Sequence, residues 1–446
     1  MKKQAILVSV IAIALLVSAC SGSKKQSDVV ELKFMYWGSL VEKTEVEKSV
    51  AAYNKLNEGK IRVVPQHVPD DYSNKLASMI AGGTAPDIAY LSSGLSSTYA
   101  KEGKILFVQD LLGDDLSFLD SVLPDAQWKV NGKVAYFSTA METLMITYNK
   151  DIFDQHNIKY PPSRFEEALK WDDFVSLCQS VTFDKNGNNA KSPNFDPNNI
   201  VTYGLSVSTY LNHLLQLVYS AGGTVLNAAG TDTAIDTPAW INTMNKVNDL
   251  IYKYHVVPSP SVADTLAAEA MLTGQIAMTF DGNWSLLDYQ DQGLNVGCAV
   301  FPNLGLGPFT MSAPGVTAIF STTKYPQEAW DFYKYSLDAE KGPTDLFKKG
   351  LWQPIYFEYY TDPAKISFWV DNPAHPPEYR DVVIANINRN IVPLPASYIY
   401  RWGDVTQLLT PAIEAIFGAP GDAGPILKGA QATITSSKAF KGRFDL

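Results

Sequence analysis

The stretch from Thr139 to Pro162, TAMETLMITYNKDIFDQHNIKYPP, decides how this chain is divided. It begins with an apolar run that is interrupted by a single acid, Glu142, and it ends at two prolines. The pattern is typical of a chain that leaves one globular unit and enters another through a buried strand. A lone carboxylate in apolar surroundings is costly without a partner. We therefore expect Glu142 to meet either a ligand or a structural partner at this crossing.

The composition is that of a globular chain with a large core. Of its 446 residues, 46% are hydrophobic and 18% are charged, and this length favours two domains. The formal net charge is −10, and no cluster of Lys and Arg follows Lys25. Because nucleic-acid phosphates bind to such clusters, the sequence argues against a nucleic-acid partner.

The N-terminus has the pattern of a secretory signal. Lys2 and Lys3 precede a short apolar run that ends in small residues and Cys20. The run is shorter than the roughly 20 residues that span a bilayer. Its ending, LVSAC, resembles a bacterial lipobox, which implies that residues 1–19 are removed and that Cys20 is acylated. Residues 20–28 then form a tether; the alternative is an unlipidated signal peptide with an incidental cysteine.

The remaining cysteines and a polar loop give no clear metal site. Cys178 and Cys298 lie in apolar segments without CxxC spacing, which favours two buried thiols over a disulfide. The DKNGNN segment, within residues 184–196, has oxygen-bearing side chains at alternating positions. Its Gly187 is misplaced for a calcium loop, and no Glu closes it. We expect a surface hairpin and no metal there, and calcium binding stays an open alternative.

Strands and helices alternate from the start of the mature chain. Three strands and two intervening helices are predicted at residues 29–39, 41–60, 61–68, 70–83 and 84–93. This βαβαβ order predicts a mostly parallel sheet covered by helices. Ligands bind at the carboxyl ends of such strands, so Trp37, Ser92 and Ser93 become candidate site residues. Further along, the NGK turn at 131–133 predicts a hairpin.

Six segments resemble one family in order and cover nearly the whole mature chain. They are FMYWG, YSNKLASMIAGGTAPDIAYL, METLMITYNKDIFDQHNI, LVYSAGG, GQIAMTFDGNW and PGVTAIFSTTKYPQEAWDFYKYSL. Together they resemble the extracellular solute-binding proteins (family 1, maltose-binding-like) of bacterial carbohydrate ABC transporters, here of the lipoprotein type. The chain departs from the family pattern at YFSTAMET, which lacks an upstream proline, and its tail after Lys349 matches only loosely.

The resemblance implies an α/β fold with two lobes, the type II clamshell of periplasmic binding proteins. The chain would cross between the lobes three times, near residues 142–147, 308–313 and 346–352. The first lobe would contain residues 29–142 and 313–346. The second lobe would contain residues 147–308 and 352–446.

A sugar site needs flat aromatic rings for the C–H faces of the ligand and polar groups for its hydroxyls. By resemblance, Glu142 matches a sugar-contacting glutamate and Trp284 a sugar-stacking aromatic. Alternatively, Glu142 is a structural carboxylate, and each aromatic side chain packs in the hydrophobic core instead of facing a ligand. Gly315 would let backbone approach the ligand. The candidate ligand-binding residues are Trp37, Ser92, Ser93, Glu142, Tyr210, Asp281, Trp284, Gly315, Trp352 and Arg401.

The resemblance implies a monomeric receptor without catalysis or cofactor. It would capture a mono- or oligosaccharide outside the cytoplasm while anchored to a membrane, and deliver it to the transmembrane subunits of an ABC permease. The chain has no Walker A pattern of its own. One alternative is an anchored glycoside hydrolase that uses two carboxylates, such as Glu142 and Asp281, about 5–10 Å apart. Another is a receptor of the same fold for a polyamine or a different solute.

Overall fold

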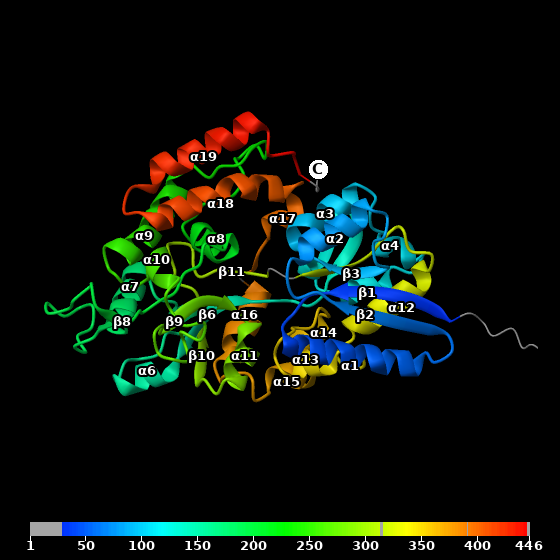
Figure 1. The fold of residues 1–446 in the computed structure, drawn as a ribbon, viewed down its shortest axis with the longest axis horizontal. Helices are drawn as coiled ribbons and strands as arrows, with labels where there is room; N and C mark the ends of the chain where they lie inside the picture. The colour runs from blue at the N-terminus through cyan, green and yellow to red at the C-terminus, as the bar shows by residue number, and fades with distance from the viewer. Residues whose placement is uncertain (1–28, 313–314, 390, 444–446) are drawn as a thin grey trace, which may run out of the picture.

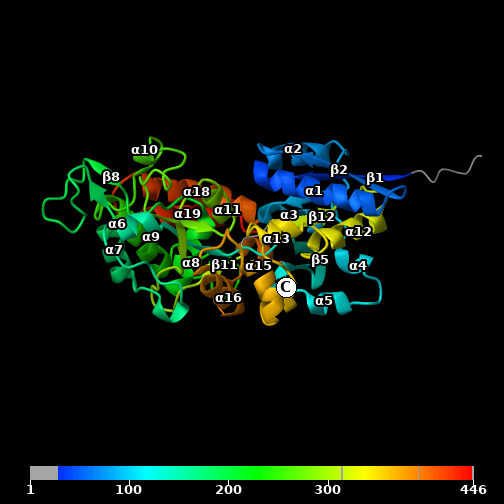
Figure 2. The ribbon, with the colours of Figure 1, turned by 90° about the horizontal axis from the view of Figure 1, so that it is seen from below.

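The computed structural model describes residues 29–312, 315–389 and 391–443. Two α/β lobes lie side by side in the view of Figure 1, each built around its own sheet. The turned view in Figure 2 shows the same division. Within the described ranges, no helix has the length and apolar character that crossing a membrane would require.

The first lobe contains a six-stranded sheet in the order β2-β1-β3-β12-β5-β4. Its strands are β1 (Val30–Tyr36), β2 (Ile61–His67), β3 (Ile88–Leu91), β4 (Gln127–Val130), β5 (Lys133–Ser138) and β12 (Val316–Ile319). The strands β2, β1 and β3 are parallel, as the βαβαβ pattern predicts. The other half is antiparallel, because β12 returns from far along the chain and pairs with both β3 and β5. The sheet is therefore mixed rather than mostly parallel.

Local chemistry explains the elements of this lobe. The Ser39 hydroxyl accepts a hydrogen bond from the backbone N–H of Glu42 and caps α1 (Leu40–Leu56) at its N-terminus. The predicted NGK hairpin joins β4 to β5, and Asn131 and Gly132 have φ of 54° and 74°, the left-handed values of a tight hairpin turn. The helical segments are α1 (Leu40–Leu56), α2 (Tyr72–Ala81), α3 (Ser93–Lys101), α4 (Val108–Leu111), α5 (Ser117–Ser121), η1 (Pro124–Ala126), α12 (Pro326–Leu337), α13 (Thr344–Lys348), α14 (Glu358–Thr361) and α15 (Pro363–Val370).

The second lobe surrounds a smaller antiparallel sheet in the order β10-β6-β9. Its central strand is β6 (Leu144–Asn149), which is buried along its whole length between β9 (Met278–Gly282) and β10 (Val296–Ala299). Two short pairs accompany this sheet: β7 (Phe183–Asp184) with β8 (Ile200–Thr202), and β11 (Thr310–Met311) with β13 (Ile391–Val392). The helical segments are α6 (Lys150–Gln155), η2 (Phe165–Glu167), α7 (Trp171–Ser180), α8 (Leu211–Ser220), α9 (Pro238–Tyr252), α10 (Pro260–Ala263), α11 (Ser285–Asp291) and α16 (Tyr379–Arg389).

Two connections run between strands of the two lobes. The first runs from β5 to β6 and contains Glu142, which lies just before the strand rather than within it. The second runs from β11 to β12, and residues 313–314 of it lie outside the described part of the chain.

The segment after the third predicted crossing, near residues 346–352, contacts the first lobe. The backbone of Leu123 bonds to Ile355, and that of Phe357 bonds to Ser121. These bonds hold residues 355–357 against the first lobe, whereas the sequence assigned 352–446 to the second. Further along the chain, α16 packs against β10 of the second lobe. The other lobe boundaries stay a prediction.

The C-terminal helices bridge the two lobes at the top of Figure 1. They are α17 (Pro395–Tyr398), α18 (Trp402–Gly418) and α19 (Ala423–Ser437). Both α17 and α18 contact α3 of the first lobe, whereas α18 and α19 contact α9 of the second. Pro411 lies inside α18.

Cys178 and Cys298 are unpaired and fully buried, which confirms the expected thiols. In the loop at 184–196, the Asp184 carboxylate accepts hydrogen bonds from the backbone N–H groups of Asn186, Asn188 and Asp196. A calcium ion would have to displace these donors. No group of three or more potential metal-binding side chains is found within the described ranges.

Candidate ligand-binding site

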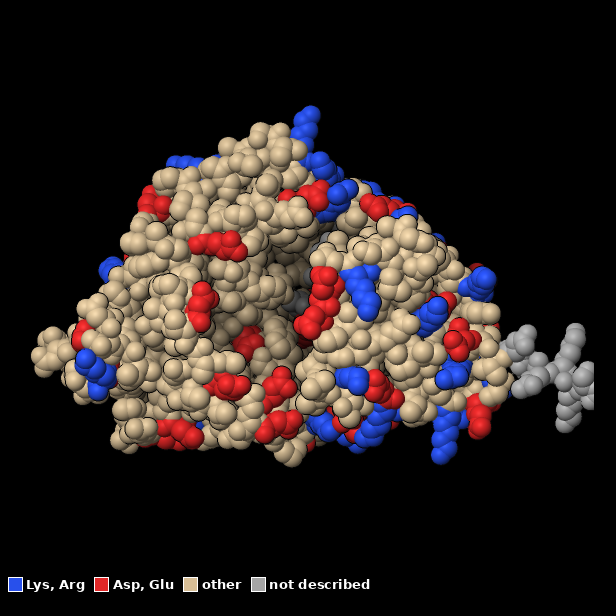
Figure 3. Space-filling view, viewed as in Figure 1, with Lys and Arg blue, Asp and Glu red and all other residues tan. Residues whose placement is uncertain are grey.

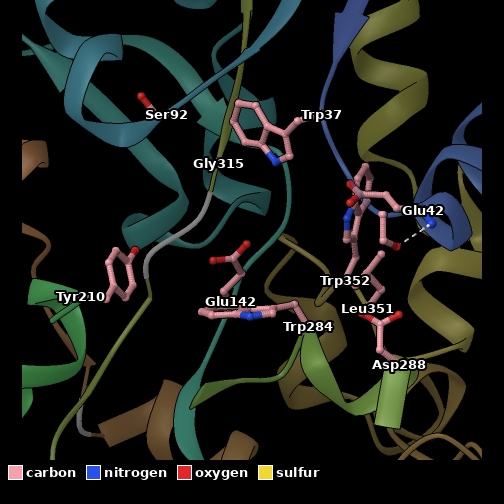
Figure 4. A pocket seen from close by; sticks show the side chains of 11 residues that line it. Trp37, Glu42, Ser92, Glu142, Tyr210, Trp284, Asp288, Gly315, Leu351 and Trp352 are labelled. Carbon is pink, nitrogen blue, oxygen red and sulfur yellow. Dashed lines mark hydrogen bonds between the residues drawn. The ribbon is translucent and has the colours of Figure 1, made fainter. Parts of the chain in front are cut away.

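A cavity of about 420 Å³ lies between the lobes. Figure 3 shows the molecule hollowed at this boundary, with acidic side chains nearby. The cavity is lined by side chains from both lobes and from the segments between them. The lining residues are Trp37, Ser39, Glu42, Ser92, Glu142, Tyr210, Trp284, Asp288, Gly315, Leu351 and Trp352 (Figure 4).

The first lobe contributes residues at the carboxyl ends of its parallel strands. Trp37 directly follows β1, and Ser39 and Glu42 lie at the start of α1. Ser92 follows β3 and occupies the N-cap position of α3, without a capping hydrogen bond from its side chain. Parallel strands end at one edge of the sheet, so the fold brings these side chains together.

The second lobe contributes residues that precede or begin helices. Trp284 follows β9, and Asp288 lies in α11. Tyr210 precedes α8 and remains 45% exposed, and its hydroxyl accepts a hydrogen bond from Asn212 Nδ2 at 2.6 Å. Burial raises the pKa of Tyr210 to about 12, and the charge of Glu142 adds to the shift. The Tyr210 hydroxyl thus stays protonated and can donate to a ligand.

The crossing segment fixes Glu142 on the cavity floor. Its backbone N–H donates to Ser312 Oγ at 3.1 Å, which ties the first crossing to the second. The next residue, Thr143, donates its N–H to Asn283 Oδ1 at 2.9 Å and its hydroxyl to Gln353 Oε1 at 3.0 Å. No described residue forms a hydrogen bond with the Glu142 carboxylate, which points into the cavity above the Trp284 ring (Figure 4).

Packed aromatic side chains hold the indole rings of Trp37 and Trp352, which form walls of the cavity. The ring of Trp37 meets Tyr72 and Tyr90 edge to face, with centroids 4.9 and 5.2 Å apart. The ring centroid of Trp352 lies 6.3 Å from that of Tyr90 and 5.7 Å from that of Phe347. Edge-to-face contacts of this kind restrict ring orientation. The walls are therefore set before any ligand arrives.

Three glycines leave space for cavity side chains. A Cβ on Gly282 would lie 2.2 Å from Cζ3 of Trp284, and one on Gly315 would lie 2.6 Å from Cζ2 of Trp37. Gly38, at φ +137°, leaves room for the Glu42 carboxylate in the same way. Gly315 thus makes space for an indole ring, in addition to any approach of its backbone to a ligand.

We expect Gly282→Ala to weaken ligand binding about tenfold or more. The added methyl group occupies the place of the Trp284 ring, and displacement of one wall by about 1 Å disturbs a preorganised site. Titration calorimetry with the best saccharide ligand measures the effect. Gly429→Ala in α19 is the matched control, because nothing lies within 4 Å of the added atom; equal affinities for the two variants would contradict this role.

The cavity carboxyl groups are electrostatically coupled. Burial raises the pKa of Glu142 to about 8, and the charge of Glu42 adds to the shift. Burial raises the pKa of Glu42 to about 7; the Trp352 side chain opposes this shift and the charge of Asp288 adds to it. Burial, followed by the charge of Asp291, also raises the pKa of Asp288. Each acid therefore resists ionising while its neighbours are charged.

Seven of the ten candidate residues line the cavity: Trp37, Ser92, Glu142, Tyr210, Trp284, Gly315 and Trp352. The side chain of Ser93 lies outside the described part of the chain. Asp281 and Arg401 are described but are not among the lining residues. Their surroundings explain why.

The carboxylate of Asp281 is used within its own lobe. It accepts hydrogen bonds from Ser285 Oγ at 2.6 Å, Tyr289 OH at 2.9 Å and the N–H of Gly282 at 2.8 Å. Asp281 thus fixes the turn that presents Trp284. Arg401 precedes α18 and donates from Nε to Asp404 at 2.9 Å, with its side chain 46% exposed. Neither side chain is placed to meet a ligand in the cavity.

The sequence reasoning missed four lining residues: Ser39, Glu42, Leu351 and Asp288. Ser39 and Glu42 lie at the start of α1, which follows the strand end that revealed Trp37. The capping serine was a signal that could have found them. Asp288 lies one helical turn beyond Trp284, which places both on one face. Leu351 carried no sequence signal beyond its proximity to Trp352.

Known proteins resemble the chain over most of its length. A family model described as bacterial extracellular solute-binding protein matches residues 48–377. The maltodextrin-binding protein MdxE of Bacillus subtilis is 25% identical over 353 residues, covering 75% of this chain and 76% of that protein. A maltotriose-binding protein of Pyrococcus abyssi is 22% identical over 310 residues, which cover 68% of this chain but only 62% of the relative.

Solved structures show the same fold. The ABC substrate-binding protein Lmo0181 of Listeria monocytogenes, in complex with cycloalternan, superimposes with a TM-score of 0.79. The match covers 93% of this chain and 100% of the other at 20% identity. The maltodextrin-binding domain MalE of Bdellovibrio bacteriovorus, bound to maltotriose, reaches 0.73 at 18% identity, covering 92% and 100% of the two chains. With two lobes that meet at a lined cavity and a family model that spans most of the sequence, the chain belongs to the bacterial extracellular solute-binding proteins.

Proposed function

We propose that this protein is the substrate-binding lipoprotein of an ABC importer. It captures a carbohydrate in the interlobe cavity and delivers it to the transmembrane permease. The observation that carries the proposal is the cavity itself, in which three indole rings and Tyr210 accompany three carboxyl groups. Flat rings suit the C–H faces of a sugar, and the carboxyl groups suit its hydroxyls.

The position of the cavity supports capture by closure. Trp37 and Glu42 belong to the first lobe, whereas Tyr210 and Trp284 belong to the second. A ligand that touches both sets gains contacts only when the lobes are close, so it shifts the balance toward the closed form. A permease that binds the closed form would then select loaded receptors.

Binding without catalysis agrees with the site. The glycosidase alternative needed Glu142 and Asp281 on either side of a glycosidic bond. Asp281 instead accepts three hydrogen bonds from its own turn and is not a lining residue. The matching family is one of solute-binding proteins. Incubation with a panel of glycosides should release no reducing sugar. Release of reducing sugar would support the glycoside hydrolase alternative.

Titration calorimetry and small-angle scattering test the proposal together. Malto-oligosaccharides and a panel of other saccharides should include at least one ligand of micromolar affinity, equivalent to about −8 kcal/mol. The same ligand should reduce the radius of gyration as the lobes close. The proposal fails when no saccharide binds, or when a bound saccharide leaves the scattering curve unchanged.

Lipid anchoring at Cys20 is the membrane part of the proposal. Residues 1–28 lie outside the described part of the chain, so this proposal depends on the LVSAC segment alone. We expect Cys20→Ala to move most of the protein from the membrane fraction to the soluble extracytoplasmic fraction. Cell fractionation and intact-mass measurement check this. An unmodified Cys20 in membrane-free wild-type protein would indicate an ordinary secreted form.

A further inference from the structure

The described cavity wall is acidic and lacks a protein cation. Glu42, Glu142 and Asp288 line it, and neither Lys nor Arg is among its described lining residues. Figure 4 shows Glu142 above the ring of Trp284, whereas Glu42 and Asp288 lie on the side of the space where Trp352 lies. An ionised carboxylate only accepts hydrogen bonds. The cavity therefore suits a ligand that is rich in donors.

Buried acids elsewhere in the molecule have partners. Glu45 forms ion pairs with Lys48 and Lys349, and Glu378 pairs with Lys150. The Glu142 carboxyl group has no hydrogen-bond partner among the described residues, and burial together with the charge of Glu42 opposes its ionisation. An uncompensated charge that leaves water is costly. A ligand that supplies positive charge would remove this cost on closure.

The aromatic walls suit the same ligand. Trp37, Trp284 and Trp352 surround the cavity, and a cation over an indole face is attracted by the negative potential of the ring. Rings and carboxylates together form a lining that recognises an ammonium group. The serine hydroxyls of the first lobe, from Ser39 and Ser92, leave hydrogen-bonding groups for neutral hydroxyls as well.

We infer that the captured saccharide carries a protonated amine, so that the cavity is selective for amino sugars over neutral sugars. The inference depends on the proposed function and narrows its ligand class. The amine would lie between Glu42 and Glu142, and the sugar rings would stack on the indoles. A polyamine without a sugar ring would satisfy the acids but would leave the flat walls and the serine hydroxyls without matching groups.

Paired ligands test the inference by calorimetry at pH 7. The pairs are glucosamine with glucose, galactosamine with galactose, and the glucosamine disaccharide with cellobiose. N-acetylglucosamine, maltotriose and spermidine complete the panel. In every pair that binds, we expect the amino sugar to bind at least tenfold more tightly than its hydroxyl counterpart.

Charge-removing variants connect the preference to the cavity. Glu142→Gln and Glu42→Gln keep the shape of the side chains, and each should reduce the preference at least fivefold. Asp331→Asn on α12 is the matched control, because this exposed acid lies outside the cavity and should leave the preference unchanged.

The pH dependence has opposite signs for the two ligand classes. Between pH 5.5 and pH 7 a sugar amine stays protonated, whereas Glu42 and Glu142 begin to ionise. The neighbouring titratable groups are Asp288, whose pKa is raised by burial, and Tyr210, whose pKa of about 12 keeps its hydroxyl protonated throughout this window. A cation expels protons from the acids, so its affinity should rise with pH, by up to about tenfold per unit for each proton released. A neutral sugar that uses protonated carboxyl groups as donors should bind equally or more weakly as pH rises.

The outcomes separate the inference from the function it depends on. A neutral saccharide that binds as tightly as its amino counterpart, with affinity that does not rise with pH, overturns the amine inference and leaves the sugar receptor in place. Binding of spermidine alone, or of no member of the panel, overturns both. A tenfold amino preference that Glu142→Gln removes supports both.

Discussion

Trp284→Ala is expected to weaken saccharide binding by about 100-fold while the protein stays folded. The ring forms a wall of the cavity directly beneath the Glu142 carboxylate (Figure 4). Removal of a central aromatic side chain from a desolvated binding site typically costs about 2–4 kcal/mol. Calorimetry with the best ligand of the panel measures the loss, and circular dichroism reports the fold.

Two companion variants make this result specific. Trp284→Phe keeps a flat ring and should recover most of the lost affinity. Tyr325→Ala removes another exposed aromatic side chain, from a position outside the cavity, and should not change affinity. If Trp284→Ala binds saccharide as well as the wild type, the cavity described here is not the binding site.

Glu378→Ala should lower the free energy of unfolding by about 3–5 kcal/mol. Its carboxylate lies 3.0 Å from Lys150 Nζ and accepts a hydrogen bond from Tyr148 at 3.2 Å. The side chain of Lys150 is only 11% exposed, so loss of its partner leaves a charge in a poorly solvated place. Breaking one side of a buried pair has costs of this size. Urea unfolding followed by fluorescence measures the change.

The double variant separates lost charge from lost packing. Lys150→Met with Glu378→Leu replaces the pair by apolar side chains and should recover most of the stability. Asp331→Ala breaks the exposed pair with Lys334, where both side chains are more than 40% exposed, and should cost about 0.5 kcal/mol or less. A Glu378→Ala effect as small as this control would mean that solvent already screens the Lys150 charge.

The sequence predicted Trp37 and Ser92 of the first lobe because they follow strand ends. The βαβαβ alternation gives parallel strands, and their shared edge brings Trp37 and Ser92 together. The same logic fails for β12, whose position between β3 and β5 depends on a return to the first sheet at Val316, long after β5 ends at Ser138. Long-range pairing of this kind leaves no local signal in its own few residues.

One physical reason explains why the sequence analysis missed Glu42 and wrongly placed Asp281 in the cavity. Asp281 and Glu42 are both acids near strand ends, and sequence alone favoured Asp281. The outcome was decided by local partners: Ser285 and Tyr289 bind the Asp281 carboxylate, whereas Gly38 leaves space for Glu42 to face the cavity. Such differences lie in side-chain geometry rather than in residue type.

The C-terminal bridge has a consequence for how far the molecule can open. Because α18 contacts α3 on one side and α9 on the other, any separation of the halves must slide or bend this helix. Pro411 cannot donate the backbone hydrogen bond that a helix interior normally uses, so α18 lacks one bond of its ladder there. We expect α18 to bend at Pro411 when the lobes separate. The energy needed to bend it would limit the opening angle and would favour return of the ligand-free receptor to its relaxed conformation.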